Sequence, residues 1–285
     1  MNSVVVLLLV LASLGVYWTQ RAVDRRVGLF RGTEEVLYLP SGKVIKALSL
    51  GHHGLLADIY WMRAVQYYGG KRLKNEKRFD LLDPLIQIAV TLDPKLLHAY
   101  RFGSIFLSER SPVGAERPEK AVALLQNGIE QNPDEWQLYR DLGFVYYWYI
   151  EDYKQAAHWF LEGSKNPNSA RWMRTFAAEL LAKGGSRDSA RFLWQELLAS
   201  SEDEQMRRNA RENLLRLQAL DEIDALTKLI RKVETRTGSK VSSFGELINL
   251  GLLKQIPLDP KGAPYQLNAE TGEVSLSPQS SVRRF

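Results

Sequence analysis

Cysteine is absent from this chain of 285 residues. Without thiols, the protein has no disulfide, no thiolate metal ligand, no c-type haem attachment, no lipoprotein-type acylation and no cysteine nucleophile. Histidine is scarce, with four copies. The neighbours His52 and His53 would diverge by about 100° on a helix, and His98 and His158 are isolated from other histidines along the chain. The sequence therefore predicts no metal site.

Long runs of one charge and the common catalytic motifs are missing as well. The net charge is +5, but lysine and arginine alternate with acidic residues instead of forming the basic stripe of a nucleic-acid binder. We interpret the short basic stretch 71–78 as a solvated loop. No nucleophile elbow, phosphate loop or zinc-protease motif is present. Asp58 and Arg63, five residues apart, are better explained as polar edge residues or as an ion pair with a neighbouring helix than as an acid–base couple. We expect no nucleic-acid partner, no cofactor, no catalytic residue and no enzyme activity.

One strongly apolar stretch begins the chain. Residues 3–17 are uncharged and almost wholly apolar, and Trp18 follows them. A membrane-spanning helix needs about 20 residues, so the stretch extended to Gln20, with Trp18 at the interface, predicts one transmembrane helix. A cleaved signal peptide is the alternative, but a basic leading segment and a clear cleavage site are absent. We expect residues 1–20 to be an anchor or uncleaved signal, with residues 3–19 held in the membrane.

The centre of the chain contains two short amphipathic helices, at about 136–149 and 153–164. Each has small and large residues on one face, which allows close antiparallel packing. These residues are Tyr139, Leu142, Gly143 and Tyr146 on the first helix, and Ala156, Phe160 and Gly163 on the second. Gly143 and Ala156 are expected to face each other, and Pro167 ends the unit.

The same pattern recurs at a fixed period. Ala121, Ala156 and Ala190 are 35 and 34 residues apart. The matching positions are Phe102, Gly103, Phe106, Ala121, Leu125, Gly128 and Pro133 upstream, Ala177, Ala178, Leu181, Ala190 and Trp194 downstream, and Leu82, Ile86, Ala89 and Pro94 in a further half-unit. This array resembles the tetratricopeptide repeat, a helix–turn–helix unit of about 34 residues. The resemblance implies three to four repeats in a helical solenoid over residues 54–203.

Irregular segments interrupt and flank the array. Residues 21–53 form a juxtamembrane segment, in which a small hairpin turning at Pro40-Ser41-Gly42 or an irregular cap is possible. The helix at 54–68 is expected to stop at Gly69-Gly70, and residues 108–118 lengthen a turn. Residues 204–237 predict one long helix, or two in series if Asp221 caps a second one.

The composition changes after Gly238. A short helix near 242–251 and a β-hairpin that pairs Tyr265 and Leu267 with Val274 and Leu276 are expected. With its string of prolines and Gly262, the tail 238–285 resembles the C-terminal module of type II secretion major pseudopilins. The prepilin cleavage motif and the calcium loop of that family are absent, so polymerisation and calcium binding do not carry over.

The resemblance to tetratricopeptide repeats implies a concave groove for protein partners. Family positions that face the groove fall on Phe144 and Tyr147, with Arg140 on the same side. Aromatic residues and arginine are typical anchors of a partner segment, although packing between repeats is an equally good role for large aromatics. The candidate groove residues are Tyr100, Arg140, Phe144, Tyr147, Trp148 and Glu179.

Together these features predict a mainly α protein with a transmembrane helix, a tetratricopeptide-like solenoid and a small α+β tail. We expect a non-catalytic, membrane-anchored scaffold for protein–protein interactions in an envelope assembly of the secretion, pilus or transport type. A permanent structural subunit of a larger membrane complex is the alternative. Arginines after the anchor favour a cytoplasmic solenoid. The tail favours the outer side of a bacterial-type inner membrane, which we narrowly prefer.

Overall fold

The computed structural model describes residues 13–21 and 39–283 and divides into two compact units, Met1–Pro40 and Ser41–Phe285. In the first unit, residues 13–21 are helical and exposed. Within the described residues, no helix is both long enough and apolar enough to cross a membrane. Most of the predicted anchor, residues 3–12, and most of the juxtamembrane segment, residues 22–38, lie outside the described residues.

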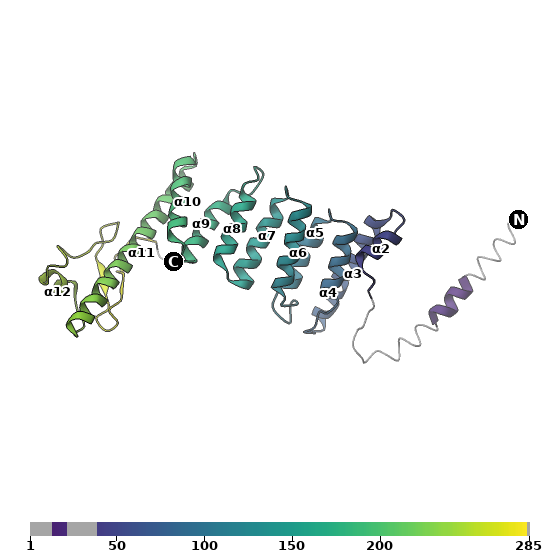
Figure 1. Ribbon diagram of the computed structural model, residues 1–285, viewed down its shortest axis with the longest axis horizontal. Helices are drawn as coiled ribbons and strands as arrows, with labels where there is room; N and C mark the ends of the chain where they lie inside the picture. Colours follow the sequence, from purple (N-terminus) through teal and green to yellow (C-terminus); the bar gives the residue numbers. More distant parts are fainter. Residues whose placement is uncertain (1–12, 22–38, 284–285) are drawn as a thin grey trace. The chain divides into compact units, whose positions relative to one another are not determined.

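The second unit is mainly helical, and one small two-stranded sheet follows the helices (Figure 1). From α3 to α11, each α-helix packs against the next along the chain. Short connections make such neighbours antiparallel, so the arrangement is that of helical repeats. The elements are α2 (Gly42–Leu48), α3 (His53–Leu73), α4 (Leu82–Leu92), α5 (Leu97–Ser108), α6 (Pro118–Gln131), α7 (Trp136–Val145), the π-helical turn η1 (Tyr146–Ile150), α8 (Tyr153–Ser164), α9 (Trp172–Lys183), α10 (Arg187–Ser200), α11 (Glu204–Thr237), α12 (Phe244–Asn249), β1 (Tyr265–Leu267) and β2 (Val274–Leu276).

Glycines on the first helix of a pair allow the second helix to approach closely. A Cβ at Gly143 of α7 would lie 2.9 Å from the Phe160 ring of α8. The expectation that Gly143 faces Ala156 is therefore wrong in detail, because the nearest side chain is the ring one turn further along α8. In the preceding pair, both helices carry such a glycine: a Cβ at Gly103 of α5 would lie 3.1 Å from Leu124, and a Cβ at Gly128 of α6 would lie 2.8 Å from the Tyr100 ring.

Two expectations at the start of the second unit are wrong. Residues 42–48 form α2 instead of a hairpin arm, because the Ser41 hydroxyl caps the helix by accepting a bond from the Val44 N–H at 3.4 Å. Helix α3 also continues through Gly69-Gly70 to Leu73. Glycine permits a helix end without requiring one, and Lys71 and Arg72 in the last turn suit the negative end of the helix dipole.

The loop that joins α5 to α6, residues 109–117, fits the predicted insertion. It folds back on the end of α5, since the N–H groups of Ala115 and Arg117 donate to the carbonyls of Phe106 and Leu107. Gly114 is buried there, with no room for a side chain, because a Cβ would lie 2.5 Å from the Glu109 side chain.

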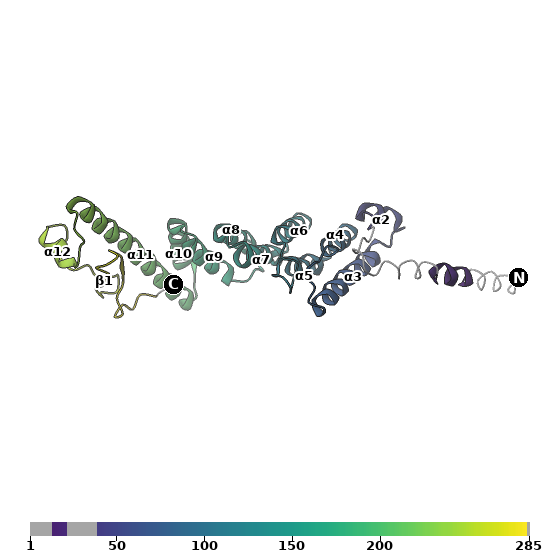
Figure 2. The same cartoon turned by 90° about the horizontal axis from the view of Figure 1, so that it is seen from below.

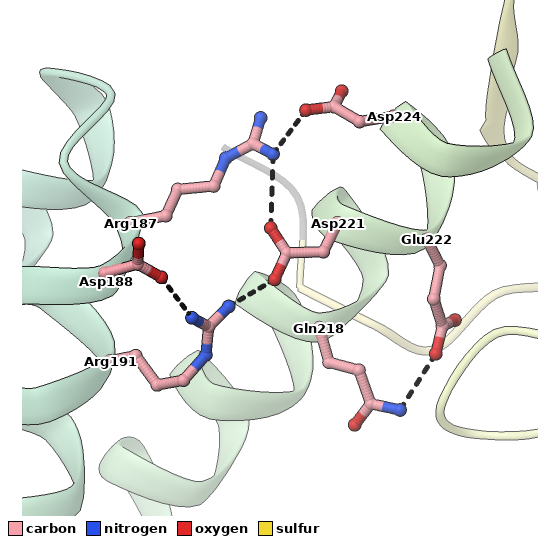
Figure 3. A network of polar contacts seen from close by, with 7 residues as sticks. All are labelled: Arg187, Asp188, Arg191, Gln218, Asp221, Glu222 and Asp224. Carbon is pink, nitrogen blue, oxygen red and sulfur yellow. Dashed lines mark hydrogen bonds and ion pairs between the residues drawn. The ribbon is translucent and has the colours of Figure 1, made fainter. Parts of the chain in front are cut away.

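Helix α11 is continuous, so Asp221 does not begin a second helix. The Asp221 carboxylate instead accepts from Arg191 and, at 3.3 Å, from Arg187, both on α10 (Figure 3). Arg187 also reaches Asp224 at 2.6 Å. These groups are partly exposed, and exposed ion pairs contribute little. The buried contacts of Trp194 and Leu217 between the same helices therefore carry most of the packing energy.

The tail packs on the second half of α11, and its predicted hairpin is confirmed. Strands β1 and β2 are antiparallel, with Tyr265 opposite Leu276 and Leu267 opposite Val274. Both views place α12 and the strands beside α11 (Figures 1 and 2). The Tyr265 hydroxyl donates to Glu222 of α11 at 2.6 Å. A separate small core forms here from Leu226, Ile230, Val233, Val241, Phe244, Leu247, Tyr265 and Val274.

Candidate partner-binding surface

Aromatic side chains from three successive helices gather in one place. The Phe144 ring of α7 stacks on Trp148 of η1, with ring centres 4.4 Å apart. The centre of the Phe144 ring also lies 5.8 Å from the ring centre of Trp172 on α9 and 5.1 Å from that of Phe160 on α8. Phe160 is fully buried, whereas Trp148 is 55% and Trp172 is 41% exposed. The cluster thus has a buried base and two exposed indoles.

The π-helical turn η1 places Trp148 on this cluster. The Glu151 N–H donates the π-helical bond to the Tyr146 carbonyl and ends the helix in a left-handed conformation with φ 61°; the Asp152 N–H donates to the same carbonyl at 3.1 Å. Such turns alter the direction of the side chains that follow and are frequent at functional sites. The periodicity of residues 136–149 predicted one regular α-helix, but the last part is a π-helical turn. Hydrophobic spacing does not indicate where a turn contains one extra residue.

A solvent-open groove of about 530 Å³ begins at Trp172. It lies between the start of α9 and the first three turns of α11, and Arg283 from the end of the described chain contributes to it. Its lining consists of Arg171, Trp172, Thr175, Asp203, Gln205, Met206, Arg208, Asn209, Glu212 and Arg283.

The groove has cationic groups available for a ligand. Within the described residues, no ion pair is recorded for Arg171 or Arg208. The two acidic groups of the lining are engaged: Asp203 accepts from the Gln205 N–H as the cap of α11, and Glu212 pairs with Lys261 at 2.5 Å. The groove is therefore basic overall, and the exposed indole of Trp172 lines it.

We call Phe144, Trp148, Trp172, Arg171 and Arg208 together the Trp172 surface. Its α-helical members lie on, or directly before, α7, α9 and α11. Each of these helices is the first of its pair or, for α11, follows the last pair. A surface built from such helices faces one side of a repeat array.

Tyr100 does not belong to this surface. It is fully buried, and burial raises the pKa of its hydroxyl to about 12. The prediction of Tyr100 as a groove residue is wrong, because its ring fills the space that Gly128 leaves between α5 and α6. Ser104 and Leu107, which share its face of α5, are buried as well.

The other predicted residues divide into two groups. Phe144, Tyr147 and Trp148 are brought together, and Tyr147 is half-buried against Phe176 with ring centres 5.3 Å apart. Arg140 lies one turn before Phe144 on α7 and has other contacts: its guanidinium pairs with Asp141 at 2.6 Å and stands 5.3 Å from the centre of the Trp136 ring.

Glu179, the last predicted groove residue, is half-buried on α9, and its charge affects Arg216 of α11. Burial lowers the pKa of Arg216, and the negative charge of Glu179 opposes that effect. Glu179 therefore has an electrostatic role between helices, which a pattern of groove positions cannot distinguish from a partner contact.

Sequence reasoning missed Arg171, Trp172, Phe176 and Arg208. Trp172 and Phe176 are four residues apart on α9, with ring centres 6.0 Å apart. That spacing was visible in the sequence as an aromatic pair on one helix face. The sequence could not predict that Trp172 contacts Phe144. Nor could it predict that Arg171 and Arg208, from two different helices, line the same groove.

The histidines remain without a site. His52 precedes α3 as its cap residue and His53 begins the helix. Within the described part of the chain, no group of three or more histidine or acidic residues is placed to hold a metal ion. Compared with known proteins, the chain matches no protein-family model, and it matches no curated protein.

Proposed function

We propose that the protein is a non-catalytic, membrane-anchored scaffold whose tetratricopeptide-like solenoid binds protein partners. The observation that carries the proposal is the Trp172 surface. There the exposed Trp172 lines a groove with Arg171 and Arg208, which have no recorded ion pair within the described residues, and the exposed Trp148 stacks on the neighbouring Phe144. Tryptophan and arginine are the residues most often found at binding hot spots. In this account, residues 3–19 anchor the chain and the pseudopilin-like tail faces an envelope assembly.

The chemistry of the surface suggests what it binds. Exposed indoles offer flat apolar area, and guanidinium groups pair well with carboxylates. The expected partner segment therefore has an apolar or aromatic side chain near an acidic one. Repeat proteins commonly hold an extended segment or one helix on a concave face, and we expect the partner segment to bind in one of these forms.

Site-specific photo-cross-linking in cells tests the proposal. A photoreactive amino acid at Trp148 is expected to capture a discrete partner protein. The matched control is Phe192 of α10, which is 70% exposed but away from the surface. Equal capture from both positions, or none from Trp148, would contradict the proposal.

A permanent structural subunit of a larger complex remains the second candidate. Four exposed apolar residues of the tail lie within nine positions of one another and favour it, because exposed apolar side chains that gather in one place are commonly covered by a partner. They are Leu250, Leu252, Ile256 and Leu258. Purification in mild detergent separates the two. A scaffold is expected to purify alone, whereas a permanent subunit co-purifies with fixed stoichiometry.

The side of the membrane is tested through the loop between α3 and α4. Lys77 is exposed there, and the native chain has no cysteine, so a Lys77→Cys variant carries a single label site. The proposal expects labelling by an impermeant maleimide when only the outer barrier is opened. Labelling that appears only after the inner membrane is lysed would place the solenoid in the cytoplasm.

A further inference from the structure

Helix α3 has an apolar stripe that nothing in the described chain covers. Leu55, Ile59, Met62 and Leu73 lie in one line along the helix, with exposures from 45% to 88%. The buried residues of α3 lie on the opposite side, roughly 200° around the helix, and pack toward the rest of the fold. These are Ala57, Trp61, Ala64 and Tyr68. The helix is therefore apolar on two faces, and only one of them is packed.

The spacing of the stripe is that of a two-stranded coiled coil. Leu55 and Met62 occupy d positions of a heptad, and Ile59 occupies the a position between them. A β-branched residue at a with leucine at d favours a parallel pair of helices. Gln66, at the next a position, can hydrogen-bond to its own copy and so fix the register.

The charges beside the stripe complement those of a second, identical helix. Asp58 falls at a g position and Arg63 at the following e position, five residues later. In a parallel pair, g of one helix lies beside that e position of the other. Neither residue has an ion pair recorded in the described part of the chain, and the Arg63 guanidinium only rests 5.7 Å from the centre of the Tyr60 ring. An antiparallel pair would instead place g beside g and e beside e, so that Asp58 and Arg63 would not face each other.

We propose that the α3 stripe binds α3 of a second copy of this chain in a parallel, in-register pair. Leu55, Ile59 and Met62 meet their own copies across the axis. Two equivalent Asp58–Arg63 ion pairs flank them, one on each side. The proposal is independent of the Trp172 surface, which lies on other helices.

Disulfide cross-linking of the full-length protein in detergent tests the pairing. Leu55→Cys and Gln66→Cys are made separately, each as the only cysteine of the chain. In a parallel register, each residue lies beside its own copy, so mild oxidation is expected to give covalent dimers several-fold faster than in Phe192→Cys, the exposed control on α10. A rate no higher than that control at either position overturns the proposal.

Charge reversal then tests the register. In the Gln66→Cys background, Asp58→Arg and Arg63→Asp are each expected to slow cross-linking several-fold. The double exchange, which restores opposite charges across the pair, is expected to return the rate toward that of the parent. Both side chains are exposed, so the thermal midpoint should stay unchanged. Single variants as fast as the parent, or a double variant as slow as the singles, overturn the ion-pair assignment.

Discussion

At the scale of single residues, close contact between a glycine and a ring defines the helix pairs. Gly143 is buried against Phe160, and that ring is fully enclosed by its neighbours. A side chain at position 143 must therefore displace a ring that has no free space to enter.

We expect Gly143→Leu to destabilise the protein by about 1–3 kcal/mol, because overpacking forces the ring and backbone to shift. Thermal or denaturant unfolding measures the change. Gly54→Leu is the matched control, since no atom lies within 4 Å of a Cβ there and leucine is the better helix former. Equal unfolding midpoints for the two variants would contradict the close contact between α7 and α8.

Single residues also mark where sequence reasoning failed at the site. Tyr100 and Arg140 occupy equivalent family positions, yet the first is fully buried and the second is partly exposed. The difference arises from the partner helix: Gly128 opposes Tyr100, whereas Gly163 of α8 opposes Tyr139 and not Arg140. Pattern alone places a residue on a helix face but does not say what lies opposite.

At the scale of elements, periodicity predicted which segments are helices better than where they end. Helix α8 begins and ends where its apolar pattern does, and α11 has the predicted length. The stop at Gly69-Gly70 and the hairpin at Pro40-Ser41-Gly42 were wrong. Glycine and proline permit several backbone conformations, and the choice depends on caps and contacts that local sequence does not encode.

The junction of α10 and α11 allows ionic and apolar contributions to be compared. We expect Asp221→Ala to cost at most about 1 kcal/mol, because its pairs with Arg187 and Arg191 are partly exposed. Trp194→Ala is expected to cost about 3–5 kcal/mol, because the side chain is fully buried. Urea unfolding of both variants measures these values. A larger effect from Asp221→Ala would show that the ion network holds the junction.

The tail depends on one buried carboxylate. Asp259 accepts from the N–H groups of Lys261 at 2.8 Å and Ala263 at 3.0 Å, and from the Ser280 hydroxyl. Burial alone would raise its pKa, but these hydrogen bonds together lower the pKa below the usual value.

We therefore expect Asp259→Ala to destabilise the tail by about 1–3 kcal/mol, because buried donors lose their acceptor. Hydrogen exchange across residues 257–283 measures the loss. Protection in α7 and α8 should stay unchanged, since these helices lie in a separate core. Unaltered exchange in the tail would contradict the role assigned to Asp259.

At the scale of the whole molecule, the account rests on surfaces that the fold assembles from distant segments. The sequence indicated aromatic groove residues near 144–148, but Arg171, Trp172 and Arg208 join them only through the packing of α7, α9 and α11. Periodicity reports burial within one helix. It does not report which exposed residues of separate helices become neighbours.

The central claim is that the Trp172 surface binds a protein partner, and a comparison of two exposed aromatics tests it most directly. Once cross-linking has identified the partner, its affinity is measured by calorimetry for the parent, Trp172→Ala and Phe192→Ala proteins. We expect Trp172→Ala to lose at least about 2 kcal/mol of binding free energy, the cost typical of a hot spot. Phe192→Ala should bind like the parent, and all three proteins are compared at a temperature where each is folded. Unchanged affinity in Trp172→Ala, or equal losses in both variants, would contradict the account.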